Sequence, residues 1–185
     1  MEQDIGNGLD ICITGGRFCA FTFRSEYSAM HLLPLSAGKE FFIAAEEGET
    51  GLDGYTLRRI GDIQHISANS GDFAARAAMA DRPDADSLPP LDLDSTEGLL
   101  ASLCGLNAVI IIEKYGTPSN GGLIMGRLLD AGIRGCIICP IDFSGVWADT
   151  PVPVDAGDIK SISFGRKSLE PYSKLIVRCP FKKSK

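Results

Sequence analysis

The chain has 185 residues, of which 44% are hydrophobic and 23% are charged, a balance typical of a folded globular protein. Its longest uncharged apolar run, from Ala108 to Ile112, is much shorter than the roughly 20 residues that a membrane helix needs. The acidic, polar N-terminus is unlike a signal peptide, so we expect a cytoplasmic protein with no membrane partner.

The net charge of −6 is unevenly distributed along the chain. Residues 165–185 carry seven Lys or Arg and one Glu, which gives +6. The preceding 164 residues carry 11 Lys or Arg and 23 Asp or Glu, which gives −12. A basic tail on an acidic body favours contact with phosphate groups, and the alternative is a solvated chain end.

The first elements along the chain have the character of short strands. In 18–24, alternate residues are apolar, which is the period of a half-buried strand. Residues 40–45 are apolar on both faces and predict a more deeply buried strand. The heptad Gly61–Ser67 has two isoleucines three residues apart, which predicts a 3₁₀-type turn followed by a short strand.

The middle of the chain has a different composition. Asp72 can cap a short helix, and 81–94 is rich in Asp and Pro, which predicts an extended linker. Asp94 is the predicted N-cap of a second helix, with Glu97 reaching back to it and Gly105 ending it. The apolar stripe of this helix consists of Leu99, Leu100, Leu103 and Leu106, and we expect the helix to plug the open end of a small barrel.

The heptad GDIxxIS returns at Gly157–Ser163, 96 residues after its first appearance. Segments 31–67 and 127–163 can be compared without a gap, and 135–141 is again apolar on both faces. One small unit of about five short strands is therefore present twice. After the second copy, Tyr172, Leu175, Ile176 and Cys179 have helical spacing and are expected to dock on it.

These patterns resemble the Sm-like (LSm) small-barrel superfamily, whose bacterial member is the Hfq-type RNA chaperone. Segment 123–132 is similar to the Sm1 pattern, with Gly126 as the central glycine that permits sharp strand bending. Both heptads are similar to the end of the Sm2 pattern. The chain also resembles uncharacterised bacterial proteins that pair two such barrels, and Gly54–Arg59 fits their Gly-Tyr-x-Leu-x-Arg signature.

The resemblance implies a mostly β fold of two tandem Sm-like, SH3-type, five-stranded barrels with short accessory helices. Closure of each barrel would remove exposed strand edges. The expected organisation is a first barrel at 8–70, a short helix and linker at 71–94, a helix plus second barrel at 95–168, and a C-terminal helix with basic tail at 169–185.

The chain departs from the RNA site of this superfamily. The Sm1 asparagine position falls near Gly38 and Arg134, and the basic-Gly pair of Sm2 has become Ile60-Gly61 and Ala156-Gly157. The first copy has Met30 where the central glycine is expected. The fold is therefore a firmer implication than RNA binding.

Basic side chains near the heptads are the candidates for contact with nucleic-acid phosphates. They are Arg58, Arg59, Lys160, Arg166 and Lys167. Trp147 lies at an expected hairpin tip, where it can anchor a partner or fold back onto its own barrel.

No catalytic or metal-binding pattern is present in the sequence. Cys136 and Cys139 have CxxC spacing, but in a strand they lie on opposite faces and pack as apolar groups. The other cysteines, including Cys12 and Cys19, are expected to be reduced and unpaired, as in a cytoplasmic chain. Neither histidine adjoins a nucleophile motif, so we expect no enzyme and no cofactor.

Two functions remain open. The first is a non-enzymatic Sm-like module that binds RNA or assembles through its barrels, with three chains of two barrels each forming a six-membered ring. The alternative is a protein-interaction or scaffold module that binds no nucleic acid, which the acidic body and Trp147 favour.

Overall fold

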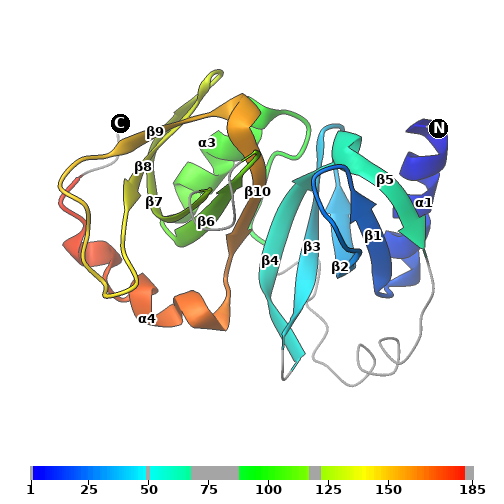
Figure 1. Cartoon of the computed structure of the whole chain (residues 1–185), viewed down its shortest axis with the longest axis horizontal. Helices are drawn as coiled ribbons and strands as arrows, with labels where there is room; N and C mark the ends of the chain where they lie inside the picture. Colours follow the sequence, from blue (N-terminus) through cyan, green and yellow to red (C-terminus); the bar gives the residue numbers. More distant parts are fainter. Residues whose placement is uncertain (1, 49–50, 68–87, 117–121, 182–185) are drawn as a thin grey trace.

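The protein is mostly β, as the sequence predicts. The computed structural model describes residues 2–48, 51–67, 88–116 and 122–181 (Figure 1). Ten strands form one antiparallel sheet in the order β5-β1-β2-β3-β4-β10-β6-β7-β8-β9. The strands are β1 (Cys19–Phe23), β2 (Met30–Ala37), β3 (Phe41–Gly48), β4 (Gly51–Arg59), β5 (Ile63–Ser67), β6 (Val109–Lys114), β7 (Leu123–Gly132), β8 (Gly135–Pro140), β9 (Val152–Asp155) and β10 (Ile159–Phe164).

The sheet is open, and a separate pair of closed barrels is not shown. The first half of the sheet (β1–β5) joins the second half (β6–β10) where β4 pairs with β10, and we call this pairing the seam. The two halves lie side by side (Figure 1). Because β4 and β10 pair with each other, the sheet continues across the seam and has β5 and β9 as its edges.

Both halves repeat one strand order, since the fifth strand of each half pairs with the first. A 3₁₀ turn precedes that fifth strand in both copies: η1 (Ile60–Asp62) before β5 and η3 (Ala156–Asp158) before β10. The turn and strand predicted from the heptad are therefore confirmed twice. Ile63 and Ile159, the first strand residues, are both buried.

The strand pairing shows that the alignment of the two copies expected from the heptads is wrong by two residues in the second and third strands of each half. A bulge lies at 34–36 in β2 and at 128–130 in β7, which are 94 residues apart rather than 96. Leu32, and not Met30, therefore occupies the position of Gly126. An ungapped comparison anchored on the heptads could not detect this shift, because the hairpins between the third and fourth strands differ in length.

A helix that the sequence did not reveal, α1 (Glu2–Gly15), packs against β2 and β5 (Figure 1). A disulfide joins Cys12 in this helix to Cys19 at the start of β1. The expectation that both cysteines are reduced and unpaired was wrong. The chain reverses direction between α1 and β1, so the Cα atoms of Cys12 and Cys19 lie 6.6 Å apart. The spacing of the two cysteines in the sequence does not indicate this contact.

The second predicted helix, α3 (Thr96–Leu106), begins with a different cap from the one expected. The Ser95 hydroxyl accepts a hydrogen bond from the Gly98 amide at 3.1 Å, so Ser95 is the N-cap. The carboxylate of Asp94 instead accepts from the backbone amide of Lys39 at 2.9 Å. The prediction of Asp94 as the cap was wrong, because its side chain binds the backbone of Lys39, 55 residues away in the sequence.

The helix ends at Asn107, whose φ of 54° is left-handed, and not at Gly105. The predicted stripe is buried on one face at Leu99, Leu100 and Leu103. The helix packs on β7 and β8 of the second half.

Strand β3 of the first half is buried on both faces. Phe42 and Ala44 of β3 face a core that includes α1, whereas Phe41, Ile43 and Ala45 face a larger core that includes α3. The larger core also holds apolar residues of the second half. The two halves therefore share apolar packing, and the deeply buried strand predicted at 40–45 is confirmed.

The C-terminal segment docks on the second half as predicted, but as short turns. A single helical turn, α4 (Glu170–Ser173), lies between η4 (Lys167–Leu169) and η5 (Ile176–Arg178). Leu169 and Ile176 are buried against strands β6 and β7.

Some predicted elements lie outside the described residues, namely the helix capped by Asp72, most of the Asp/Pro-rich linker and the end of the basic tail. Among the helices that the structure describes, none combines the length and the apolar character needed to span a membrane.

Candidate functional site

The five basic side chains predicted to contact phosphate do not form one patch. Arg58 and Lys160 lie close together at the seam, because each contacts Glu26. Arg59 follows Arg58 in β4 and points to the opposite face. Arg166 and Lys167 come after the end of β10. The fold therefore distributes these charges over three places.

Arg58 and Lys160 share two carboxylates, and we call the four residues Glu26, Arg58, Glu113 and Lys160 the seam network. Arg58 Nη1 donates to Glu26 Oε1 at 2.8 Å. Lys160 Nζ lies 2.9 Å from Glu26 Oε1 and 2.8 Å from Glu113 Oε1. The side chains of Arg58 and Lys160 are only 5% and 10% exposed. A phosphate group could reach them only if these pairs opened.

The seam network keeps Glu26 and Lys160 charged. Burial by itself raises the pKa of Glu26, but hydrogen bonds from Lys160 and Arg58 outweigh it and hold the pKa below the ordinary 4.5. Burial lowers the pKa of Lys160, but Glu113 and Glu26 outweigh that effect and raise the pKa above 10.5. The pair between Lys160 and Glu26 therefore persists through the neutral pH range.

Arg59 also joins the two halves, on the other face of β4. Its guanidinium donates to Thr96 Oγ1 at 3.1 Å and to the carbonyl of Ala156 at 3.0 Å. The guanidinium carbon lies 4.8 Å from the centroid of the Phe41 ring, a cation–π distance. Since Thr96 begins α3 and Ala156 begins η3, this side chain links β4 to the second half.

The remaining two basic residues differ from each other. Arg166 forms an ion pair with Glu46 and donates to Ser163 Oγ at 3.1 Å. Lys167 uses its backbone amide to contact Asp53 Oδ1 at 2.7 Å, and its side chain is exposed. Within the described residues, Lys167 is the one member of the five whose side chain makes no ion pair.

Sequence reasoning missed Glu26 and Glu113. Glu26 accepts a hydrogen bond from Arg58, 32 residues away in the sequence, and Glu113 accepts one from Lys160, 47 residues away. Neither belongs to a motif, and no local spacing connects them with their partners. Arg58 and Glu113 both lie opposite Ser161, one on each side of β10, so the pairing of β10 with β4 and with β6 brings these side chains together.

Trp147 is half-buried and folds back on the chain, which is one of the two possibilities that the sequence left open. Its Nε1 donates to the carbonyl of Leu175 at 3.1 Å. The ring packs on the core formed by Leu169 and Ile176 with residues of β6 and β7. The indole is therefore fixed in place by its own chain.

Trp147 also lines a hollow of about 530 Å³ beside the β9 edge. Four exposed apolar side chains surround this hollow, and we call them the apolar surface: Leu123 (47% exposed), Phe143 (81%), Val146 (62%) and Val152 (38%). Asp142 and Asp149 also line it. Hydrogen bonds from the Ser144 hydroxyl and the Val146 amide hold the pKa of Asp142 below its ordinary 3.8, so it is charged at neutral pH.

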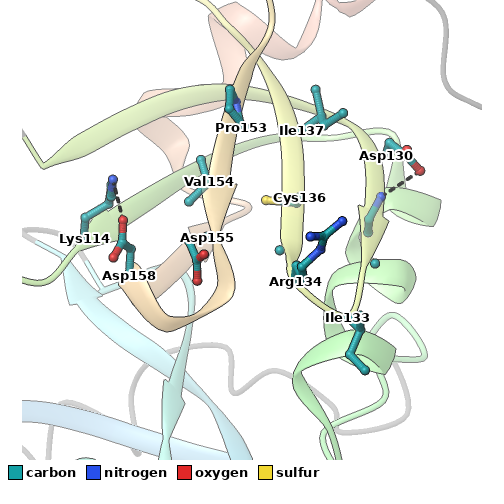
Figure 2. Close-up of a pocket in the computed structure, with 13 residues that line it drawn as sticks. Lys114, Asp130, Ile133, Arg134, Cys136, Ile137, Pro153, Val154, Asp155 and Asp158 are labelled. Carbon is teal, nitrogen blue, oxygen red and sulfur yellow. Dashed lines mark hydrogen bonds and ion pairs between the residues drawn. The ribbon is translucent and has the colours of Figure 1, made fainter.

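Figure 2 shows a second hollow, of about 770 Å³, between the β7–β8 turn and η3. It lies where the resemblance to Sm proteins places an RNA site in the second copy, because Arg134 is in its wall. Two cations face it, Lys114 and Arg134, and the Lys114 ammonium is 2.8 Å from Asp158. Three carboxylates face it: Asp130, Asp155 and Asp158. Carboxylates outnumber cations here, which disfavours a phosphate backbone.

The equivalent hollow of the first copy has the opposite charge. It encloses about 1060 Å³ beside η1 and is lined by Arg24, Lys39 and Arg59 with the single carboxylate Glu40. Lys39 makes an exposed ion pair with Asp94 at 3.4 Å, with 82% and 53% of the two side chains exposed. Exposed pairs of this kind are weak and can exchange for another anion.

The cysteines of the CxxC pattern pack as predicted. Cys136 enters the larger core, and Cys139, also buried, lies on the other face of β8. Burial raises the pKa of both thiols to about 12, so both stay protonated at neutral pH. No group of three or more His, Cys, Asp and Glu side chains among the described residues could hold a metal ion.

No family model, no curated protein and no solved structure matches the chain. The resemblance to Sm-like proteins therefore depends on the short motifs of the sequence.

Proposed function

We propose that the protein is a non-enzymatic protein-interaction module, built from two Sm-like units in one chain, whose apolar surface receives a partner. The observation that supports this is the exposure of four apolar side chains around one hollow, with Phe143 81% and Val146 62% exposed. Contiguous exposed apolar groups with a polar rim are typical of interaction sites. The half-buried Trp147 gives the hollow a rigid wall.

The charge around the hollow indicates the chemistry of the partner. Asp142 and Asp149 lie at the apolar surface, and no Lys or Arg is among the described residues that line the hollow. The partner segment we propose has a large apolar side chain flanked by Lys or Arg, so that apolar burial and charge complementarity act together. A nucleic-acid strand would instead bring phosphates toward these carboxylates.

The seam network supports the same proposal by a separate route. Two of the five candidate phosphate contacts, Arg58 and Lys160, are nearly inaccessible and already paired with carboxylates. Releasing a buried cation from its partner carries a desolvation cost that an added phosphate contact must exceed. These cations are therefore better suited to hold the two halves together than to bind RNA.

The test uses Trp147, the one tryptophan of the chain, as an intrinsic reporter. The protein is titrated with a short peptide that carries Leu and Phe between lysines, and Trp147 emission is followed. We expect a saturable blue shift as the hollow loses water. A matched peptide with Glu in place of Lys should give no shift at the same concentrations.

Variants localise the effect. Val146→Ser and Phe143→Ser should weaken the shift, whereas Ile133→Ser, equally exposed but at the β7–β8 turn, should leave it unchanged. Failure of the Leu/Phe peptide to change the emission, or equal binding of the Glu peptide, would contradict the proposal.

A second candidate function, RNA phosphate binding, is favoured by one observation, the basic hollow of the first copy. Arg24, Lys39 and Arg59 outnumber Glu40 there. Labelled oligo-uridine at low salt tests it by fluorescence anisotropy, since phosphate contacts weaken as salt rises. Binding should fall for Lys39→Glu and stay unchanged for Lys167→Glu. Absence of binding by the unmodified chain excludes this candidate.

A further inference from the structure

The strand pairing at the seam uses the backbone amide of Leu57. The amide of Ile60 donates to the carbonyl of Glu40 on the β3 side, at 2.9 Å. Amide directions alternate along an extended strand, so the amide of Leu57, three residues earlier, points away from β3. Leu57 lies opposite Ile162 of β10. The amide of Leu57 therefore belongs to the ladder that joins the two halves.

The two strands at the free edges of the sheet are the counterparts, in the repeat, of the two strands that pair at the seam. The seam joins the fourth strand of the first half to the fifth strand of the second half. The edges are β9, the fourth strand of the second half, and β5, the fifth strand of the first half. By this repeat, β9 of one chain is the natural partner of β5 of another, and such pairing would give rings or filaments.

Proline occupies the decisive position on β9. The amide of Ala156 donates to the carbonyl of Arg134 at 2.9 Å, as the amide of Ile60 does in the first half. By the same alternation, the nitrogen of Pro153 points away from β8, toward the free edge. Pro153 is therefore the counterpart of Leu57, and Pro151 is the counterpart of Tyr55. Neither proline can donate a hydrogen bond to an added strand.

The charges that bridge the seam are also missing from the free edges. Ninety-six residues separate the counterparts in this part of the repeat, so Val154 stands in place of Arg58. On the other edge, Gln64 stands in place of Lys160. A β9–β5 contact between two chains would therefore lack two of the backbone donors that β4 offers at the seam, and also the ion pairs of the seam.

We propose that Pro151 and Pro153 close the β9 edge against a second copy of this chain, so that pairing of the seam type occurs once, within the chain. The ring of three chains expected from the Sm resemblance is then blocked at this edge. The proposal is independent of partner binding at the apolar surface, because it concerns the backbone nitrogens of Pro151 and Pro153. Val152 belongs to that surface but serves in the test only as a site for a cross-link.

The test replaces the prolines to restore the missing backbone donors of β9, and it uses a cysteine cross-link to detect the register of a β9–β5 pairing between two chains. The repeat places Val152 of one chain opposite Ser67 of the other, because Thr56 lies opposite Ser163 at the seam. Full-length chains carrying Val152→Cys and chains carrying Ser67→Cys are mixed under mild oxidation, with Cys179→Ser in both. The experiment is then repeated with Pro151→Thr and Pro153→Thr added to the Val152→Cys chain.

We expect no cross-linked pair when the prolines are present, and a cross-linked pair together with larger species in sedimentation velocity when they are replaced. Pro90→Thr, at an exposed site outside the sheet, serves as the matched control and should behave like the unmodified chain. Equal cross-linking with and without the prolines would overturn the proposal. So would a folded, proline-free chain, verified by circular dichroism, that forms no cross-link.

Discussion

The ammonium of Lys160 lies 2.9 Å from the carboxylate of Glu26, which ties the fifth strand of the second half to the turn after β1 in the first half. Lys160 also contacts Glu113, and Glu26 also accepts from Arg58. The ion pairs therefore form one connected set across the seam. Removing a single member leaves a poorly compensated charge in a place that water reaches only in part.

Replacing Lys160 by Met should destabilise the fold. The side chain is 10% exposed and compensates two carboxylates, so its loss leaves both with fewer partners. We expect the free energy of unfolding in urea to fall by about 2 kcal/mol, below the full cost for a completely buried pair because Glu113 is partly exposed. Lys39→Met is the matched control, since its pair with Asp94 is exposed and contributes little to stability. Equal effects of the two substitutions would show that burial of the seam network is unimportant.

Stability should fall in acid partly through Glu26. Burial raises the pKa of this carboxyl, but the hydrogen bonds from Lys160 and Arg58 prevail and keep the folded-state pKa below 4.5. Its contribution is therefore complete above about pH 4.5 and is lost as the pH falls through the folded-state value. Urea midpoints measured from neutral pH into acid should decline less steeply for Glu26→Gln than for the unmodified protein. Parallel declines would contradict the role assigned to Glu26.

The disulfide between Cys12 and Cys19 should anchor α1 on β1. Closing a loop between residues seven positions apart is worth about 2–3 kcal/mol in the chain-entropy description. The double variant Cys12→Ser and Cys19→Ser should lower the melting temperature, whereas Cys104→Ser, which changes a cysteine outside the disulfide, leaves the cross-link intact. Thiol titration of the denatured chain should find four free cysteines without reductant and six with it. Six without reductant would exclude the disulfide.

Gly126 should not tolerate a side chain. A Cβ built there overlaps the carbonyl oxygen of Cys139 on the neighbouring strand β8, and backbone cannot move aside as a flexible side chain can. We expect Gly126→Ala to cost about 1–3 kcal/mol of unfolding free energy in urea. Gly132→Ala is the control, because a Cβ there meets nothing within 4 Å. An unaffected Gly126→Ala protein would mean that β7 and β8 are not this close.

Local patterns in the sequence determined a good part of this protein. The repeated heptad predicted a turn and a strand in both copies, and η1 with β5 and η3 with β10 confirm it. The leucine stripe predicted the buried face of α3. Each of these features depends on residues a few positions apart, whose spacing alone specifies a turn, a strand or a helix face.

Tertiary structure alone decided how the two copies meet. Pairing of β4 with β10 keeps the sheet open, places Arg58 and Lys160 among carboxylates and leaves β9 at an edge. The docking of α1 on the first half likewise decided that Cys12 and Cys19 form a disulfide. These contacts join residues brought together only by long-range strand pairing and helix docking, which periodicity along the chain does not encode.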